Sequence, residues 1–237
     1  MKIEEIREIV NIDCKEVVSS DINNTEDSVE VVGVGIISNY LDSHNTMFTR
    51  ACLEDSLNNT ILHNADHIRD FDHLISNEIT TSVERMSLRS LNVDNDSDVD
   101  VFKFKSVFEK DDNPSMFRQY KKNRVRYHSI EFDWNSRIEY LCINPEYAGN
   151  ERSYAENWEK YYPLLINKEV ADKRGWFTTF EKAPILAVSA VVLGSNRITP
   201  TLSVRGYSEA LIKLNIEKSK SSRSLIDVWA TIINKNK

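Results

Sequence analysis

Apolar and polar positions alternate most clearly over residues 124–134, Arg-Val-Arg-Tyr-His-Ser-Ile-Glu-Phe-Asp-Trp. β-Branched and aromatic residues that recur with a period of two predict a β-strand. Because successive side chains of a strand point to opposite faces, Ser129 and Glu131 share one face and Ile130 and Phe132 share the other. Ile130 and Phe132 suit a protein core, so we expect Ser129 on the open face. A serine in such a position is more often an ordinary surface residue than a nucleophile.

Similar patterns predict the other main elements of the chain. Alternating or continuously apolar runs predict further strands at residues 29–37, 71–75, 101–107, 138–143 and 185–193. Helical spacing predicts helices at residues 1–20, 52–59, 116–122, 154–173 (interrupted by Pro163) and 225–233. Gly33 and Gly35 lie inside the first strand, where glycines mark a bulge or a close approach of two backbones.

Two polar segments resemble metal sites without meeting their spacing. Residues 92–100 hold four aspartates, yet they lack the glycine and the terminal glutamate of an EF-hand loop, so we predict a solvated hairpin tip. His63 and His67 are four residues apart with Asp66 between them, which allows a metal pair on one helix face. Two surface histidines in a polar loop fit this segment better. We therefore predict neither a metal nor another cofactor.

Composition narrows the class of protein. The chain has 237 residues, of which 41% are hydrophobic, enough for one large domain or two small ones. A net charge of −7 disfavours general binding to nucleic acid, leaving only a local basic patch or a small module with a basic tail. Three scattered cysteines predict a reducing compartment without disulfides. With no signal-peptide pattern and no apolar run of about 20 residues, we expect a soluble protein of cytoplasmic origin.

Five stretches, taken together and in order, resemble the tailed-phage prohead (capsid maturation) serine proteases. They are residues 42–57, 71–73 (Phe-Asp-His), 116–132 (ending His-Ser-Ile-Glu-Phe), 158–176 and 188–201. Their common order across residues 29–204 makes the resemblance more specific.

The resemblance implies an α+β fold like that of the herpesvirus assemblins, a mainly antiparallel β-barrel wrapped by helices. It implies an N-terminal extension (residues 1–28), a protease domain (29–205) with a helical insertion, and a linker with a C-terminal helix (206–237). His73 would be the general base and Ser129 the nucleophile. The implied role is cleavage of the scaffold, or of the scaffolding part of the coat protein, inside the assembling prohead in the host cytoplasm. Partners would be those two proteins and a second copy of the chain, with no nucleic acid and no membrane.

The chain departs from the family at two positions. Where the last core strand of the family commonly carries a glutamate, this chain has Ala187; where glycine usually follows the Ser-Ile pair, it has Glu131. Glu131 lies about 6.6–6.8 Å along the strand from Ser129, close to the span of a serine–imidazole–carboxylate relay. One hypothesis is that Glu131 partly replaces the missing acid. The plainer alternative is that it only faces solvent.

These departures leave two functions open. The chain is either an active serine endopeptidase of head maturation or a catalytically impaired, protease-like component of the phage head. The apolar stripe over residues 225–233 predicts a helix that packs on the protein itself or on a scaffold partner. The basic linker at residues 218–223 is a candidate for self-cleavage.

Overall fold

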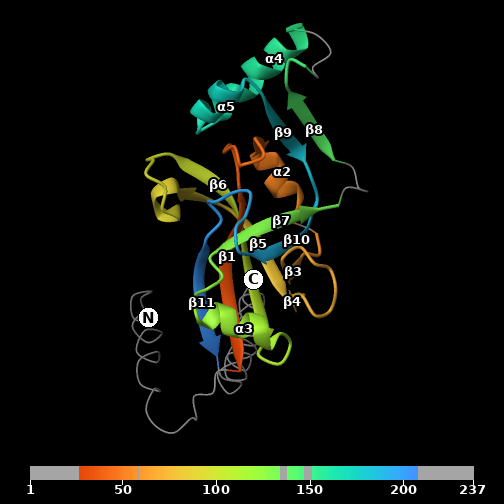
Figure 1. Ribbon diagram of the computed structural model, residues 1–237, viewed down its shortest axis with the longest axis vertical. Helices are drawn as coiled ribbons and strands as arrows, with labels where there is room; N and C mark the ends of the chain where they lie inside the picture. Colours follow the sequence, from red (N-terminus) through yellow and green to blue (C-terminus); the bar gives the residue numbers. More distant parts are fainter. Residues whose placement is uncertain (1–26, 58, 134–137, 147–150, 208–237) are drawn as a thin grey trace, which may run out of the picture.

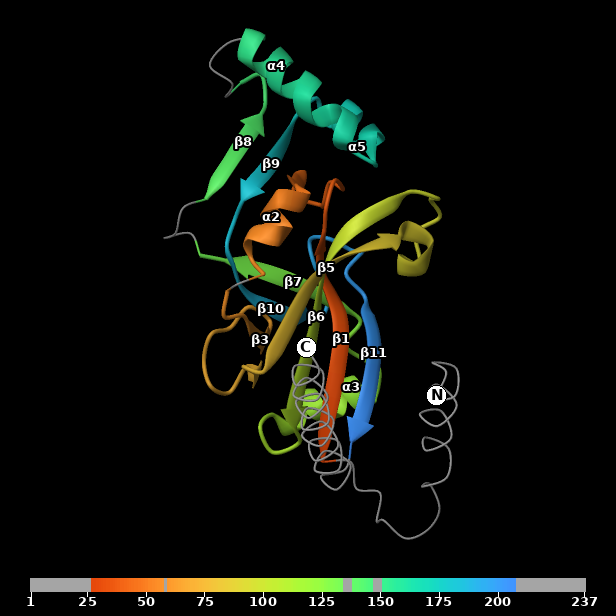
Figure 2. The same cartoon turned by 180° about the vertical axis from the view of Figure 1, so that it is seen from behind.

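Strands dominate the computed structural model, which describes residues 27–57, 59–133, 138–146 and 151–207. Within these ranges the strands form three sheets, which we name the long, crossing and distal sheets. Figures 1 and 2 show the crossing sheet running across the long sheet, with the distal sheet and its helices at one end of the molecule.

The long sheet has the strand order β11-β1-β6-β5 and is antiparallel throughout. Its strands are β1 (Ser28–Ile37), β5 (Ile79–Ser87), β6 (Asp98–Glu109) and β11 (Thr201–Tyr207). The predicted strands at residues 29–37 and 101–107 are confirmed. β11 is missing from the sequence prediction because its alternating residues follow directly on a turn.

The crossing sheet has the order β4-β3-β10-β7, in which β3 and β10 are parallel and the other pairs antiparallel. Its strands are β3 (Leu62–Ala65), β4 (Leu74–Ser76), β7 (Tyr127–Phe132) and β10 (Ile185–Val191). The strands expected around residues 124–134 and 185–193 are confirmed. The strand expected at 71–75 begins only at Leu74, because residues 71–73 form a turn.

The distal sheet carries the helical insertion. It consists of β2 (Thr46–Phe48), β9 (Phe177–Lys182) and β8 (Glu139–Ile143), in that order. The insertion comprises α4 (Glu151–Tyr161), η2 (Tyr162–Leu164) and α5 (Lys168–Arg174). The expected break falls at Pro163 inside η2, because proline has no N–H for a continuing helix.

Short helices with side-chain caps connect the sheets. The Thr49 hydroxyl caps α2 (Arg50–Asp55), and the Asn113 side-chain Oδ1 caps α3 (Pro114–Lys121) by accepting from Met116 N–H at 3.0 Å. The one-turn helix η1 (Leu88–Leu91) follows β5. The main core lies between the long and crossing sheets and includes Phe104 and Val188. Full burial of each such side chain contributes about 1.5–3 kcal/mol.

The α+β class is confirmed, but the closed barrel is wrong. Within the described ranges, every sheet ends in edge strands, so none closes on itself. Strand alternation specifies which face of a sheet is buried and says nothing about closure. The assemblin-like barrel is therefore replaced by three sheets that pack on one another.

Gly33 and Gly35 lie where β1 passes closest to its neighbours, as their place in the sequence predicts. Pairing shifts register between Val32 and Gly33 on the β11 side and around Gly35 on the β6 side. A Cβ atom at Gly33 would lie 2.8 Å from both His128 Cε1 and Phe104 Cε1. Only glycine fits there without moving two buried rings.

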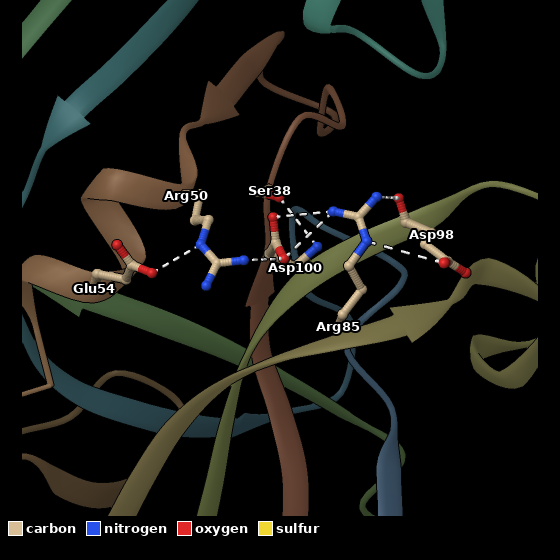
Figure 3. Close-up of polar contacts among 6 residues, drawn as sticks. All are labelled: Ser38, Arg50, Glu54, Arg85, Asp98 and Asp100. Carbon is tan, nitrogen blue, oxygen red and sulfur yellow. Dashed lines mark hydrogen bonds and ion pairs between the residues drawn. The ribbon is translucent and has the colours of Figure 1, made fainter.

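Arginines neutralise the aspartates of the segment at residues 92–100. Asp100 is only 4% exposed, and its carboxylate contacts Arg50 Nη1 at 2.8 Å and Arg85 Nη1 at 3.4 Å (Figure 3). Its N–H also donates to Ser38 Oγ at 3.3 Å. Arg50 belongs to α2, so this network ties α2 to the long sheet. The expectation of a solvated tip is wrong for Asp100, which is buried in β6.

No helix in the described ranges is both long and apolar enough to span a bilayer. The expected helices at residues 1–20 and 225–233, the linker and the proposed self-cleavage segment lie outside the described residues. The same is true of most of the N-terminal extension (1–28) and of the C-terminal part (206–237).

Candidate active site

Strand β7 presents different chemistry on its two faces. His128 is fully buried on the core face, in line with the structural role that alternation predicts. Ser129 is half-buried on the opposite face and lines two cavities. In the described part of the chain the Ser129 hydroxyl makes no hydrogen bond, so it remains free for a ligand.

A row of small polar residues crosses the sheet on the same face as Ser129. Ser129 pairs with Ser189 of β10, and Ser189 pairs with Asn64 of β3. Directly paired residues project to the same side of a sheet. The Ser189 hydroxyl donates to Glu131 Oε1 at 2.8 Å, and its oxygen also contacts Asn64 Oδ1. The sheet therefore holds a continuous polar surface next to Ser129.

Glu131 is the centre of this polar surface. Its side chain is only 9% exposed, and its Oε1 accepts hydrogen bonds from Asn64 Nδ2 at 2.7 Å and from Ser189 Oγ at 2.8 Å. Its Oε2 accepts from Arg69 Nε at 2.7 Å. Burial raises the pKa of Glu131, but the hydrogen bonds from Asn64, Arg69 and Ser189 outweigh it and hold the pKa below the ordinary value. Glu131 is therefore a carboxylate at neutral pH.

His67 lies beside that carboxylate, with its Nδ1 3.5 Å from Glu131 Oε1. The turn after β3 holds it there: Asp66 and His67 both have positive φ, 54° and 60°, and Asp66 N–H donates to Ala190 O at 3.0 Å. Because Nδ1 is the nitrogen near Glu131, Nε2 stays available to a hydroxyl. In a serine hydrolase one ring nitrogen of the histidine faces the acid and the other faces the serine hydroxyl.

Two cavities meet at Ser129. One has a volume of about 340 Å³, and the other about 450 Å³. Both are lined by Ser129, His67, His44 and Ser195. A peptide bond held at this junction would have room for chain on either side.

The walls of the two cavities differ. Three phenylalanines line the first, Phe48, Phe132 and Phe180, with ring centroids 5.2–5.7 Å apart. Val192 and Leu193 line the second and are 89% and 59% exposed. Apolar walls around a few polar groups are typical of ligand sites.

The structure does not bring His73 and Ser129 together. His73 precedes β4, which is separated from β7 by β3 and β10. Three interstrand steps of about 4.8 Å place the two backbones roughly 14 Å apart. The His73 side chain instead contacts Asp70, whose Oδ1 lies 2.6 Å from His73 Nδ1, and this hydrogen bond lowers the pKa of Asp70. His73 lines neither cavity at Ser129.

Position 187 lies directly opposite Glu131. Ala187 of β10 and Glu131 of β7 are register partners, just as Ser189 and Ser129 are. A glutamate at position 187 would therefore project beside the Glu131 side chain, on the same face of the sheet. This register places the carboxylate of Glu131 next to the position where the resembled family carries its acid.

His63 belongs to a buried cluster on the core face. The sequence-based alternatives of a surface loop or a helix face are wrong for His63, which lies in β3 and is fully buried. Tyr120 OH lies 2.8 Å from His63 Nε2 and 3.1 Å from His128 Nε2, and His63 Nδ1 lies 2.9 Å from Ser106 Oγ.

Both histidines of this cluster are neutral. Burial lowers the pKa of His63 far below its ordinary value and that of His128 to about 3. We assign a chain of hydrogens in which His128 donates to Tyr120, Tyr120 to His63, and His63 to Ser106. This assignment gives the N–H groups of both histidines and the Tyr120 O–H an acceptor, and it leaves the His128 Nδ1 lone pair without a partner. The cluster supports the core, and of its residues only His128 also lines the 340 Å³ cavity.

Asn64 and Ser189 are site residues that the sequence did not indicate, and His67 was considered only as a metal ligand or a surface histidine. No sequence signal placed these three residues beside Ser129, because their positions depend on the register of three strands and on a turn with two positive φ angles. Within the described residues no group of three or more His, Cys, Asp or Glu side chains is arranged to hold a metal ion.

Comparison with protein-family models, with curated proteins and with solved structures found no match.

Proposed function

We propose that this protein is a serine endopeptidase in which Ser129 is the nucleophile, His67 the general base and Glu131 the acid that orients the imidazole. The observation that carries the proposal is the contact of His67 Nδ1 with the buried Glu131 carboxylate, at the junction of two cavities that Ser129 also lines. His67 takes the role that the sequence resemblance gave to His73.

The chemistry follows from these positions. As Ser129 Oγ attacks the scissile carbonyl, His67 Nε2 takes the hydroxyl proton and then gives it to the leaving amine. Glu131 holds Nδ1–H toward itself and stabilises the positive imidazolium. Water then attacks the acyl-enzyme, with His67 acting as base again. The ionised state of Glu131, fixed by Asn64, Arg69 and Ser189, suits this role.

The cavity walls support a substrate class for this enzyme. Phe48, Phe132 and Phe180 would accept a large apolar side chain next to the scissile bond, while Val192 and Leu193 would contact the chain on the other side. The five ordered stretches that resemble prohead proteases support scaffold and coat protein as the natural substrates, inside the assembling phage head. A role with two or more copies of the chain belongs to the same proposal.

A second candidate is a protease-like assembly component without activity. It is favoured by the absence, in the described residues, of a hydrogen bond between Ser129 and His67. Catalytic hydrogen bonds are often long in the absence of substrate and tighten in the complex, so this observation is compatible with an enzyme.

Labelling by a fluorophosphonate separates the two candidates, because it needs an activated serine and no knowledge of the substrate. We expect the wild type to be labelled and Ser129→Ala to be unlabelled. His67→Ala should lose labelling, whereas His73→Ala should keep it. Co-expression with the cognate scaffold and coat proteins should give cleavage with the wild type and none with Ser129→Ala. Unlabelled wild type with uncleaved partners would establish the assembly component instead.

A further inference from the structure

A loop at residues 194–200 is held against β7 next to the proposed nucleophile. His128 N–H donates to Thr199 O at 3.0 Å, and the Thr199 hydroxyl donates to His128 O at 2.5 Å. Both bonds involve the residue that precedes Ser129. On its other side the loop accepts a hydrogen bond from Ser43 N–H to Ser195 O at 3.0 Å. The loop position is thus fixed relative to Ser129.

Asn196 of this loop carries an amide group without a partner. The residue is only 4% exposed and lines the 340 Å³ cavity that Ser129 also lines. Its Oδ1 accepts a hydrogen bond from Ile198 N–H at 2.9 Å, and its Nδ2 has no hydrogen-bond partner among the described residues. Because Ile198 N–H requires an acceptor, the amide orientation is fixed, and the free group is the NH₂ donor. A buried donor without an acceptor is unfavourable unless a ligand supplies one.

The proposed reaction needs such a donor. The tetrahedral intermediate of acyl transfer carries an oxyanion, which hydrolases stabilise with preorganised N–H groups. The N–H of Ser129 itself is unsuited, because His128 N–H points away from β10 and strand alternation then directs Ser129 N–H toward Ser189. A donor must therefore come from outside β10, on the cavity side of Ser129.

We infer that Asn196 Nδ2 is an oxyanion donor for the reaction at Ser129. This inference rests on the proposed function and adds to it the group that binds the developing negative charge. Loss of one oxyanion donor typically lowers the rate of the chemical step by about 10²–10³-fold, with little effect on ground-state binding.

The test uses the full chain and a fluorophosphonate, with the maximal labelling rate and the half-saturating probe concentration measured separately. Asn196→Asp keeps an acceptor for Ile198 N–H but removes the donor, and Asn196→Leu removes both without adding charge. We expect both variants to lower the maximal labelling rate by about 10²–10³-fold and to change the half-saturating concentration by less than about threefold.

Asn167→Asp is the matched control. Asn167 is also buried, at 6% exposed, but both of its amide atoms bond to Leu41 and it lines neither cavity. This substitution should lower the unfolding temperature while the folded protein keeps its labelling rate. If Asn196 had only a structural role, substitutions at position 196 would likewise lower the unfolding temperature and leave the labelling rate of the folded protein unchanged.

Each outcome decides between the possibilities. Unchanged labelling of Asn196→Leu, in a preparation where Ser129→Ala is unlabelled, would overturn the inference and leave the protease proposal standing. If Asn196→Asp labelled slowly and Asn196→Leu labelled at the wild-type rate, the effect would come from the added charge, and the inference would also be overturned. Wild type that is neither labelled nor proteolytic would remove the proposed function and the inference together.

Discussion

Replacing Glu131 by glutamine removes one charge and almost no volume, so it measures what the carboxylate does for His67. The magnitude follows from the 3.5 Å between His67 Nδ1 and Glu131 Oε1. Coulomb attraction of unit charges at this distance is about 1.2 kcal/mol in bulk water and about 4.7 kcal/mol at an effective dielectric constant of 20. At 1.36 kcal/mol per tenfold, this corresponds to about 7-fold and about 3,000-fold in rate.

The environment decides where between these limits the effect falls. The Glu131 side chain is 9% exposed, whereas the His67 side chain is 42% exposed. Water around the imidazole weakens the attraction, so we expect a loss on the order of 100-fold in the fluorophosphonate labelling rate. This is less than the about 10⁴-fold loss seen when the buried acid of a serine-protease triad is neutralised.

Two controls separate the charge at His67 from the other contacts of Glu131. Arg69→Gln removes the hydrogen bond to Oε2 but leaves the carboxylate, and it should label within about threefold of the wild type. Glu54→Gln removes a carboxylate that also accepts from an arginine Nε at 2.7 Å but lines neither cavity, and it should have no effect. An unchanged labelling rate in Glu131→Gln would refute the role of Glu131.

The cross-strand pairing offers a stricter test. The double variant Glu131→Ala with Ala187→Glu moves the carboxylate to the opposite member of a register pair. Because both positions project to the same face, the swap should recover at least part of the labelling lost in Glu131→Ala. No recovery in a folded double variant would contradict the idea that the two positions are equivalent.

Three further predictions concern the core. The pKa of His128 falls from 6.5 to about 3 on folding, so between these pH values only the unfolded chain takes up this proton, and the stability that the neutral ring contributes is lost as the pH falls through this range. Between pH 6.5 and 4.5 this amounts to about 2.3 kcal/mol, so the free energy of unfolding of His128→Gln in urea should fall by about that much less than that of the wild type; parallel curves would contradict it. Burial raises the pKa of Cys52 to about 12, so iodoacetamide should modify the half-exposed Cys142 in the folded protein and Cys52 only after unfolding, as mass spectrometry would show. Gly33→Ala places a Cβ 2.8 Å from two buried rings and should cost about 1–3 kcal/mol in chemical unfolding, whereas an unchanged midpoint would mean that the rings move freely.

Strand alternation predicted the local geometry of the site well. It placed Ser129 and Glu131 on one face of β7 and His128 on the other, which the burial of His128 bears out. It also located β1, β6, β8 and β10 to within a few residues. Such signals are local, since the period of two depends only on neighbouring residues.

What the sequence did not predict depends on contacts between distant segments. His67 approaches Glu131 only because β3 lies parallel to β10 and because the chain turns sharply at Asp66. Parallel pairing of segments more than 120 residues apart leaves no periodic signal in either one. The unpaired Nδ2 of Asn196 is equally invisible, since it depends on which neighbours are absent.

The buried histidine–tyrosine cluster also sets which residue reaches the cavities. Sliding β7 by one residue against β10 would turn His128 toward solvent and Ser129 into the core, since each step exchanges the two faces. That slip would break the hydrogen bond from His128 to Tyr120 and leave the gap beside Gly33 unfilled. The cluster on the inner face therefore fixes the register of β7 against β10, and this register directs Ser129 toward the cavities. Substitutions at Tyr120 or His63 should change activity by misaligning Ser129, although neither residue lines the cavities at Ser129.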